Sequence, residues 1–144
     1  MSVPRSKKPH PDPDVIAVGI RQPWAELILQ GIKTIEIRTV NTRQRGRIYL
    51  YASKKPAETS VAKSAATKHG LNVEELPRGV VVGSVDLHAT RPARHRDAAA
   101  ACVPADMLCE KFAWELRDAV RFTEPLAVRF LPYGIWFYPW KRRH

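Results

Sequence analysis

The segment from residue 31 to 39, GIKTIEIRT, constrains this chain more than any other part of its sequence. If it forms a β-strand, its side chains alternate between two faces. Ile35 and Ile37 then share one face, as residues that enter a core should. The other face carries a hydroxyl, a carboxylate and a guanidinium, with an ammonium at the strand entrance: Thr34, Glu36, Arg38 and Lys33. This polar face is either a solvated strand surface with paired charges or the wall of a site for a polar ligand.

Charge is the strongest signal in the composition. Lys and Arg number 24 against 14 Asp and Glu, which gives a net charge of +10. The charge is unevenly distributed, because acidic residues gather at Glu74-Glu75 and at 110–118. Between residues 38 and 55 there are six basic residues and no acidic one: Arg38, Arg43, Arg45, Arg47, Lys54 and Lys55. Such polarity favours an anionic partner, nucleic acid first and a membrane surface second, over a merely soluble cationic protein.

Length and cysteine content narrow the class of protein. A chain of 144 residues is expected to form one domain. Cys102 and Cys109 are the two cysteines, and their spacing fits no zinc pattern, so we expect a reducing compartment. The sequence contains no apolar run near the ~18 residues of a membrane span and no signal-peptide core. We therefore expect a cytoplasmic monomer without membrane association, metal or cofactor.

The pattern of residues predicts a basic, disordered arm over 1–13, one domain over 14–140 and a basic tail over 141–144. Pro23 is expected at the first position of a helix that Gly31 ends. Gly83 marks a bulge or a close backbone approach within a strand. Strands are predicted at 15–20, 31–39, 47–52, 80–89, 113–122, 126–131 and 135–138, and a turn at 123–125. Helices are predicted at 23–31, 56–69 and 106–112, and residues 98–101 could add a helical turn. Short strands and tight turns favour an α+β fold, a small closed or nearly closed mixed β-barrel flanked by two or three short helices.

Lys33 is the first candidate for a functional residue. Burial beside a helix end lowers the pKa of a lysine by up to ~3–5 units, which would make it a base or a nucleophile. Glu36 opposes that shift, because a neighbouring negative charge favours the ammonium form. A cationic Lys33 suits a phosphate or a carbonyl oxygen, so ligand binding is favoured over base catalysis. The alternative is a lysine that only extends along a strand end toward solvent.

Further side chains would complete a ligand site. Glu36 offers an acceptor to an exocyclic amine of a base, and Arg38 a fork to a phosphate, unless they pair with each other or with Arg21. Trp24 either stacks on a base or belongs to the core. On the strand at 47–52, a basic and aromatic face suited to single-stranded nucleic acid, or to ordinary barrel packing, comprises Arg47, Tyr49 and Tyr51, with Ser53 at the strand end. Contacts to a nucleic-acid backbone are expected from Arg43, Arg45, Lys54 and Lys55.

Several segments, in order, resemble the ASCH domain (activating signal cointegrator homology) family. They are IRQPWA at 20–25 with Ile28, Gly31, Lys33-Thr34, Glu36 and Arg38, then RGR at 45–47 before IYLYAS at 48–53, GVVVG at 79–83, FAW at 112–114, Pro125 and GIW at 134–136. The resemblance extends over residues 15 to 139. It implies a PUA-like β-barrel with a cleft between barrel and helices, and an association with RNA binding, RNA metabolism or recognition of modified nucleotides.

The same resemblance implies that some bacterial relatives are hydrolases. One branch removes the acetyl group of an acetylated cytidine with a Lys, a Thr and a Glu. Its Lys-Thr pair matches Lys33-Thr34, whereas its catalytic Thr falls where this chain has Glu36, and its catalytic Glu has no assigned position here.

Three functional hypotheses follow. The leading one is an RNA- or nucleotide-binding domain whose cationic cleft recognises single-stranded RNA, a modified base or a free modified nucleoside. The second is a metal-independent hydrolase, a ribonuclease or an acetylated-cytidine amidohydrolase, with Lys33, Thr34 and Glu36 as its catalytic residues. The third is a protein-interaction module in a transcription or translation assembly.

Overall fold

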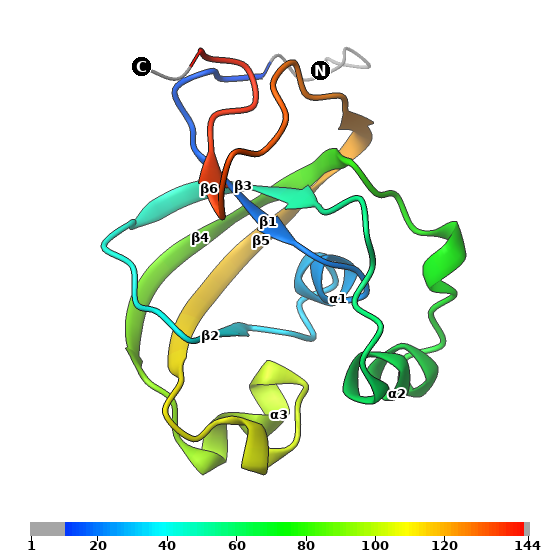
Figure 1. The fold of residues 1–144 in the computed structure, drawn as a ribbon, viewed down its shortest axis with the longest axis vertical. Coiled ribbons are helices and arrows are strands. Elements are labelled where there is room, and N and C mark those ends of the chain that lie inside the picture. Colours follow the sequence, from blue (N-terminus) through cyan, green and yellow to red (C-terminus); the bar gives the residue numbers. More distant parts are fainter. Residues whose placement is uncertain (1–10, 143–144) are drawn as a thin grey trace, which may run out of the picture.

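A single curled sheet of six strands organises the fold (Figure 1). In this computed structural model, residues 11–142 are described. The strands follow the order β2-β5-β4-β3-β1-β6 across the sheet. Their bounds are β1 Ala17–Ile20, β2 Ile35–Arg38, β3 Gly46–Ala52, β4 Val80–Pro92, β5 Phe112–Leu126 and β6 Trp136–Phe137. The helices are α1 Trp24–Leu29, α2 Ser60–Lys68 and α3 Ala98–Ala101, with 3-10 turns at η1 Val73–Glu75, η2 His95–Asp97 and η3 Ala105–Met107. The predicted α+β class is confirmed.

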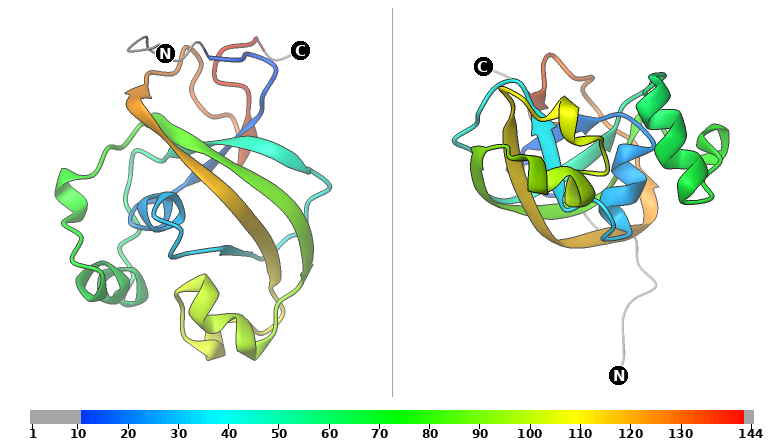
Figure 2. Two further views of the ribbon diagram at one scale, coloured as in Figure 1. Left: turned by 180° about the vertical axis from the view of Figure 1, so that it is seen from behind. Right: turned by 90° about the horizontal axis from the view of Figure 1, so that it is seen from below.

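The long strands β4 and β5 cross the molecule and bend the sheet into a half-barrel (Figure 2). Strand β1 runs parallel to β3, and the other pairs are antiparallel. Because β2 and β6 are the two edges, no backbone ladder closes the barrel within residues 11–142. The α-helices lie toward one end of the half-barrel, whereas the loops on either side of β6 lie toward the other (Figure 1).

The two faces of β2 are both covered, by different parts of the molecule. Glu36 pairs directly with Trp114 of β5 in the sheet register, and opposite residues share a face. Trp114 belongs to the main core cluster, so Glu36 faces that core. Ile35 is on the other face and packs in a satellite cluster with Ala101 and Ala113. The predicted alternation is confirmed, and the polar face is the one that points into the half-barrel.

The connection from β1 to α1 depends on one buried side chain. Gln22 Oε1 accepts a hydrogen bond from the Glu26 backbone N–H at 2.9 Å, and Gln22 Nε2 donates to the Pro77 carbonyl at 2.9 Å. Pro23 precedes the first helical residue instead of occupying it, after a cis peptide bond. Gly31 has φ +77°, which confirms that it ends the helix in the left-handed region that glycine adopts without strain. Lys33 therefore lies two residues after the glycine that ends the helix.

Three sequence-based boundaries are wrong at the C-terminal side. The helix predicted at 106–112, with Asp106 as its cap, is a 3-10 turn at Ala105–Met107, after which Phe112 already pairs with Arg38 and Pro92 in the sheet. The turn predicted at 123–125 lies inside β5, because Leu126 still pairs with Val81 of β4. Residues 127–131 form no strand, since Arg129 and Phe130 donate their N–H groups to the Pro139 carbonyl.

The predicted arm, domain and tail, with their limits at residues 13 and 140, stay a prediction. Most of the predicted basic arm, residues 1–10, and the last two residues of the predicted tail lie outside the described residues. Within residues 11–142, helices that combine the length and the apolar character needed to cross a membrane do not occur.

Candidate functional site

Lys33 is buried where the end of α1, the start of β2 and α3 meet. Its side chain is 3 % exposed. Its Nζ donates a hydrogen bond to the Ala101 carbonyl oxygen at 2.6 Å and lies 3.7 Å from Glu36 Oε1. It also lies 5.0 Å from the centre of the Trp24 ring, within the range of a cation–π contact. An ammonium has three N–H donors, so this arrangement leaves donor capacity for a further oxygen.

Glu36 lies between two cations. Arg38 Nε donates to Glu36 Oε2 at 2.7 Å, whereas Glu36 Oε1 faces Lys33. Arg38 Nη2 also donates to the Gly19 carbonyl of β1 at 2.9 Å, and its guanidinium lies 5.4 Å from the centre of the Trp114 ring. A side chain thus bridges the gap between β2 and β1 that the backbone leaves open. Arg38 is engaged in that bridge, which is the pairing that the sequence left as an alternative to phosphate binding.

A cavity of about 250 Å³, here called the Lys33 cavity, opens beside these groups. Its walls come from α1, β2, the segment before α2 and the segment around η3. They include Trp24, Lys33, Glu36, Ile37, Ala57, Thr59, Val61, Val103, Met107 and Lys111. Two lysines against one carboxylate make the cavity cationic, and an indole with an exposed Met side chain gives it apolar walls. The arrangement suits a small planar group that carries both polar edges and apolar faces.

Burial lowers the pKa of Lys33 from its ordinary value of 10.5, because removal of water disfavours the ammonium. The charge of Glu36 opposes this effect without cancelling it. Lys33 is therefore easier to deprotonate than a surface lysine, as the sequence-based argument expected of a desolvated side chain.

The other candidates near β2 take different positions. Trp24 is half-buried and lines the Lys33 cavity. Thr34 exposes its side chain, while its backbone N–H donates to the Ala100 carbonyl at 2.9 Å and its carbonyl accepts from Leu116 N–H at 2.9 Å. Arg21 is exposed before α1 and is not part of the cavity wall.

The aromatic residues of β3 are packed into the molecule, which agrees with barrel packing, one of the two alternatives that the sequence left open. Tyr51 is 2 % exposed and contacts Phe137 edge to face at 5.1 Å between ring centres. Tyr49 is 8 % exposed and contacts Phe122 and Trp140 in the same manner. Stacking on a base requires a free ring face, so ordinary packing describes both tyrosines. Ser53, at the end of β3, is half-buried next to Gly19.

The predicted backbone contacts divide between the two ends of β3, which span roughly 20 Å at ~3.3 Å per residue. Arg43 and Arg45 precede the strand. Arg45 donates to the Thr42 and Gln44 carbonyls and to Thr90 Oγ1, and Arg47 donates to Ser84 Oγ and the Asp118 carbonyl. Lys54 and Lys55 follow the strand. Lys55 is two residues from Ala57 of the cavity wall, a separation of at most about 7 Å along the chain. Lys55 therefore lies close to the wall of the Lys33 cavity, whereas Arg45 is held against β4 by its hydrogen bond to Thr90.

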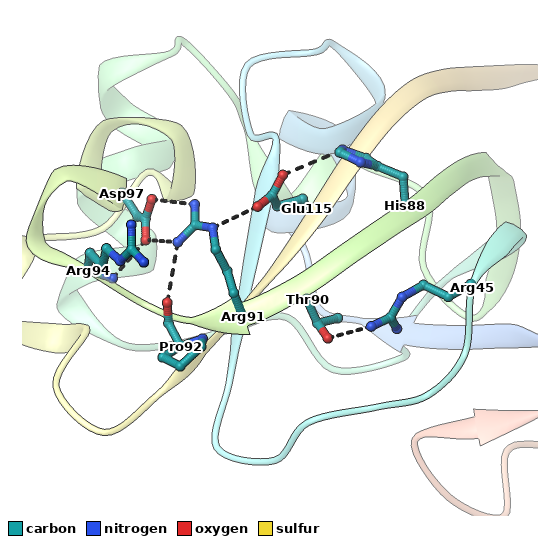
Figure 3. Close-up of polar contacts among 8 residues, drawn as sticks. All are labelled: Arg45, His88, Thr90, Arg91, Pro92, Arg94, Asp97 and Glu115. Atoms are coloured by element: carbon teal, nitrogen blue, oxygen red, sulfur yellow. Dashed lines mark hydrogen bonds and ion pairs between the residues drawn. The ribbon is translucent and has the colours of Figure 1, made fainter.

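The wall supplied by residues 98–107 was missed by the sequence analysis and is held by an ion network (Figure 3). Arg91 Nη1 and Nη2 each donate to the Asp97 carboxylate at 2.8 Å, and Arg91 Nε donates to Glu115 Oε2 at 2.7 Å. Asp97 also accepts from the Arg94 backbone N–H at 2.7 Å, directly before α3. This network attaches α3, whose Ala101 carbonyl holds Lys33, to β4 and β5. The signal in the sequence that could have indicated this network was the mixed charge of residues 91–97. Glu115, the other partner of Arg91, is distant in sequence.

Replacing Asp97 with asparagine is expected to destabilise the domain by about 2 kcal/mol at neutral pH, since hydrogen bonds to charged groups contribute ~1.5–3 kcal/mol. The Arg91 hydrogen bonds lower the pKa of Asp97 from 3.8 to about 2. A carboxylate with a depressed pKa contributes stability above its unfolded pKa, and this contribution is lost as pH falls from near 4 toward 2. When the free energy of unfolding in urea is measured across that pH range, it should fall less steeply with decreasing pH in the variant than in the unmodified protein.

The matched control is Asp106→Asn, because Asp106 is exposed on the same wall segment. If the free energy of unfolding falls equally steeply with decreasing pH in Asp97→Asn and in the unmodified protein, the ionised Asp97 carboxylate does not stabilise the domain as stated.

A second ion pair that the sequence did not reveal joins the exposed Arg121 to the buried Glu26 and fixes α1 against β5. Arg121 donates to both carboxylate oxygens of Glu26, at 2.8 and 2.7 Å, and Gln30 donates to the same group at 2.7 Å. Burial alone raises the pKa of Glu26, but these hydrogen bonds outweigh it and lower the pKa below 4.5. The pair orients the helix that carries Trp24 and ends just before Lys33.

The fold and the sequence both have known relatives. The chain is 39% identical over 77 residues to human Activating signal cointegrator 1 and 38% identical over 77 residues to the mouse protein. These alignments cover 49% of this chain and 13% of each relative, so the chain spans a small part of those proteins.

Among solved structures, the ASCH protein of Zymomonas mobilis superposes with a TM-score of 0.60 at 19% identity, covering 88% of both chains. A single-residue variant of that protein gives 0.56 at 18% identity over 90% of both chains. At this identity the likeness shows the fold. Residues 18–126, most of the chain, match the ASCH domain. The chain therefore belongs to the ASCH domain family.

Proposed function

We propose that this domain binds single-stranded RNA or a nucleotide by taking one nucleobase into the Lys33 cavity. The observation that carries the proposal is a buried lysine, adjacent to a carboxylate and an indole, in the wall of an open cavity. A buried charge is costly unless it is paired, and Lys33 has one direct hydrogen bond and a carboxylate at 3.7 Å. An incoming carbonyl oxygen would complete its coordination. Membership of the ASCH family supports interaction with nucleic acid in general.

The charges around the cavity support an anionic ligand. Lys33 and Lys111 line it, and Lys55 lies within two residues of its wall. Phosphates adjacent to the bound base would lie near these lysines, so affinity should fall with salt at a slope of about −0.7 per phosphate contacted.

Cytosine and guanine are the bases expected to bind best. Lys33 Nζ donates and Glu36 Oε1 accepts, so the ligand edge must present a carbonyl oxygen and an exocyclic amine. Cytosine and guanine carry both groups, whereas uracil lacks the amine and adenine lacks the carbonyl. Discrimination of about tenfold is expected, since a matched pair of base contacts contributes ~1–3 kcal/mol. Calorimetric titration with the four nucleoside monophosphates at one fixed salt concentration measures it.

Glu36→Gln should reduce this preference, because an amide also presents a donor to the base. Glu75→Gln, on the exposed turn η1, is the matched control and should leave the preference unchanged. Equal affinity for all four nucleotides, or no binding of any, would refute this use of the cavity.

A second candidate function, a metal-independent hydrolase, is favoured by the lowered pKa of Lys33. A neutral Lys33 can accept a proton in the cavity, with Glu36 beside it to stabilise the resulting ammonium. The two functions have opposite pH dependences. If Lys33 binds as a cation, affinity falls as pH rises through its lowered pKa; if it is the base, turnover rises through the same range. Nucleotide affinity and hydrolysis in EDTA, each followed from pH 6 to 10, distinguish them.

A further inference from the structure

A larger cavity, of about 490 Å³, lies between α2 and α3 and is here called the helix cavity. Ser60, Val61, Ser64, Ala65 and Lys68 line it from α2, at positions that share one face of a helix. Ala98, Ala99 and Cys102 face them from α3 and its C-terminus. Val61 and Val103 line both this cavity and the Lys33 cavity, so the two hollows adjoin. A ligand in the Lys33 cavity therefore has a second compartment next to it.

The chemistry of the helix cavity has two sides. Its walls are formed largely by small apolar side chains, which present flat surfaces to a planar ring. Lys68 and His69 add basic groups, and Ser60 and Ser64 add hydroxyls. No carboxylate occurs among the described residues that line it. Lys68 is exposed, and no carboxylate within residues 11–142 lies at ion-pair distance from it. An apolar ring with an attached anion matches this combination.

We propose that the domain recognises two successive nucleotides of a single strand, with the first base in the Lys33 cavity and its neighbour in the helix cavity. This inference rests on the proposed function of the Lys33 cavity. The strand would cross from one hollow to the other at Val61 and Val103, with the phosphate of the second nucleotide near Lys68. A free nucleoside would leave the larger hollow unfilled. The preferred ligand is therefore a dinucleotide unit of an oligonucleotide chain.

The affinities of cytidine monophosphate and of the dinucleotide cytidylyl-cytidine test the proposal at one salt concentration. The dinucleotide should bind about tenfold more tightly, because the second base removes apolar surface from water in the helix cavity. Ser64→Phe places a ring in the helix cavity from an exposed position and should remove this gain without changing the affinity for the monophosphate. Thr67→Phe is the matched control, because Thr67 is exposed on the same helix and does not line the cavity.

Two further readouts locate the second nucleotide. Lys68→Ala should lower the salt slope for an oligonucleotide by about 0.7, whereas Lys63→Ala, on the same helix outside the cavity, should not. The dinucleotide, but not the monophosphate, should slow alkylation of Cys102 by iodoacetamide. Cys109 is exposed and lines neither cavity, so it serves as the internal control.

The outcomes separate this inference from the function on which it rests. If the monophosphate binds and the dinucleotide gains nothing, or if Ser64→Phe leaves the gain intact, the second position is overturned and the Lys33 cavity stands. The second position is also overturned if an apolar substituent on the monophosphate raises its affinity while the dinucleotide binds no more tightly than the monophosphate. If the unmodified protein binds neither ligand, both proposals fail.

Discussion

Lys33→Met is expected to abolish most nucleotide binding while the domain stays folded. Methionine has nearly the length of lysine and is accommodated in apolar surroundings, whereas it offers no donor to a base or a phosphate. The loss of a charged hydrogen bond in a desolvated site corresponds to a decrease in affinity of about 10- to 100-fold. Fluorescence anisotropy with a labelled cytosine-rich oligonucleotide measures it.

The fold should tolerate this change because the remaining partners stay paired. Glu36 keeps its 2.7 Å contact with Arg38, and removal of a buried charge offsets the loss of the hydrogen bond to the Ala101 carbonyl. The melting temperature should therefore change little. Lys63→Met, at an exposed position of α2, is the control for loss of one positive charge. Binding that is equally weak in Lys63→Met would mean that net charge, and not the cavity, holds the ligand.

Gly83→Ala is expected to have the largest effect on stability. A Cβ atom at this position of β4 would lie 2.2 Å from the Val120 carbonyl oxygen and 2.7 Å from Leu29 Cδ2 of α1. The carbonyl belongs to β5, so it can move only if the β4–β5 ladder shifts. Overpacking typically costs ~1–3 kcal/mol and occasionally more, and a clash with backbone places this variant at the upper end. A decrease of roughly 10 °C in Tm follows for a domain of this size.

Gly134→Ala is the matched control, because the nearest atom to its Cβ would be the Trp136 carbonyl oxygen at 3.9 Å, an ordinary contact. Its Tm should stay within about 2 °C of the original, as for surface substitutions within ±0.5 kcal/mol. A Gly83→Ala protein that melts with the control would show that β4 and β5 separate easily at this point.

Much of the fold follows from local patterns. The alternation of Ile35 and Ile37 with Glu36 and Arg38 correctly predicted a strand with two different faces. Gly31 correctly predicted a helix end, with φ +77°, and Gly83 a close backbone approach. These predictions succeeded because backbone conformation and side-chain direction depend on neighbours a few residues away.

The failures have a common cause in long-range pairing. Residues 106–112 carry a helical pattern, but Phe112 is held in the sheet by Arg38 and Pro92. Pro125 suggested a turn, but the ladder with β4 extends through Leu126. The sequence left open whether Tyr49 stacks on a base or packs in the barrel, and Phe122 and Trp140 cover its ring from distant parts of the chain. In each case the outcome depends on a partner far away in sequence.

The candidate site shows the same division. Local sequence alone was sufficient to bring Lys33 and Glu36 together, since they are three residues apart at a strand entrance. The burial of Lys33, its hydrogen bond to Ala101 and the two adjoining cavities arise only when α3 packs against β2. Arg91, Asp97 and Glu115 hold that packing across the sheet. Periodicity specifies which groups a strand can present, whereas desolvation and enclosure depend on elements that meet only in the folded chain.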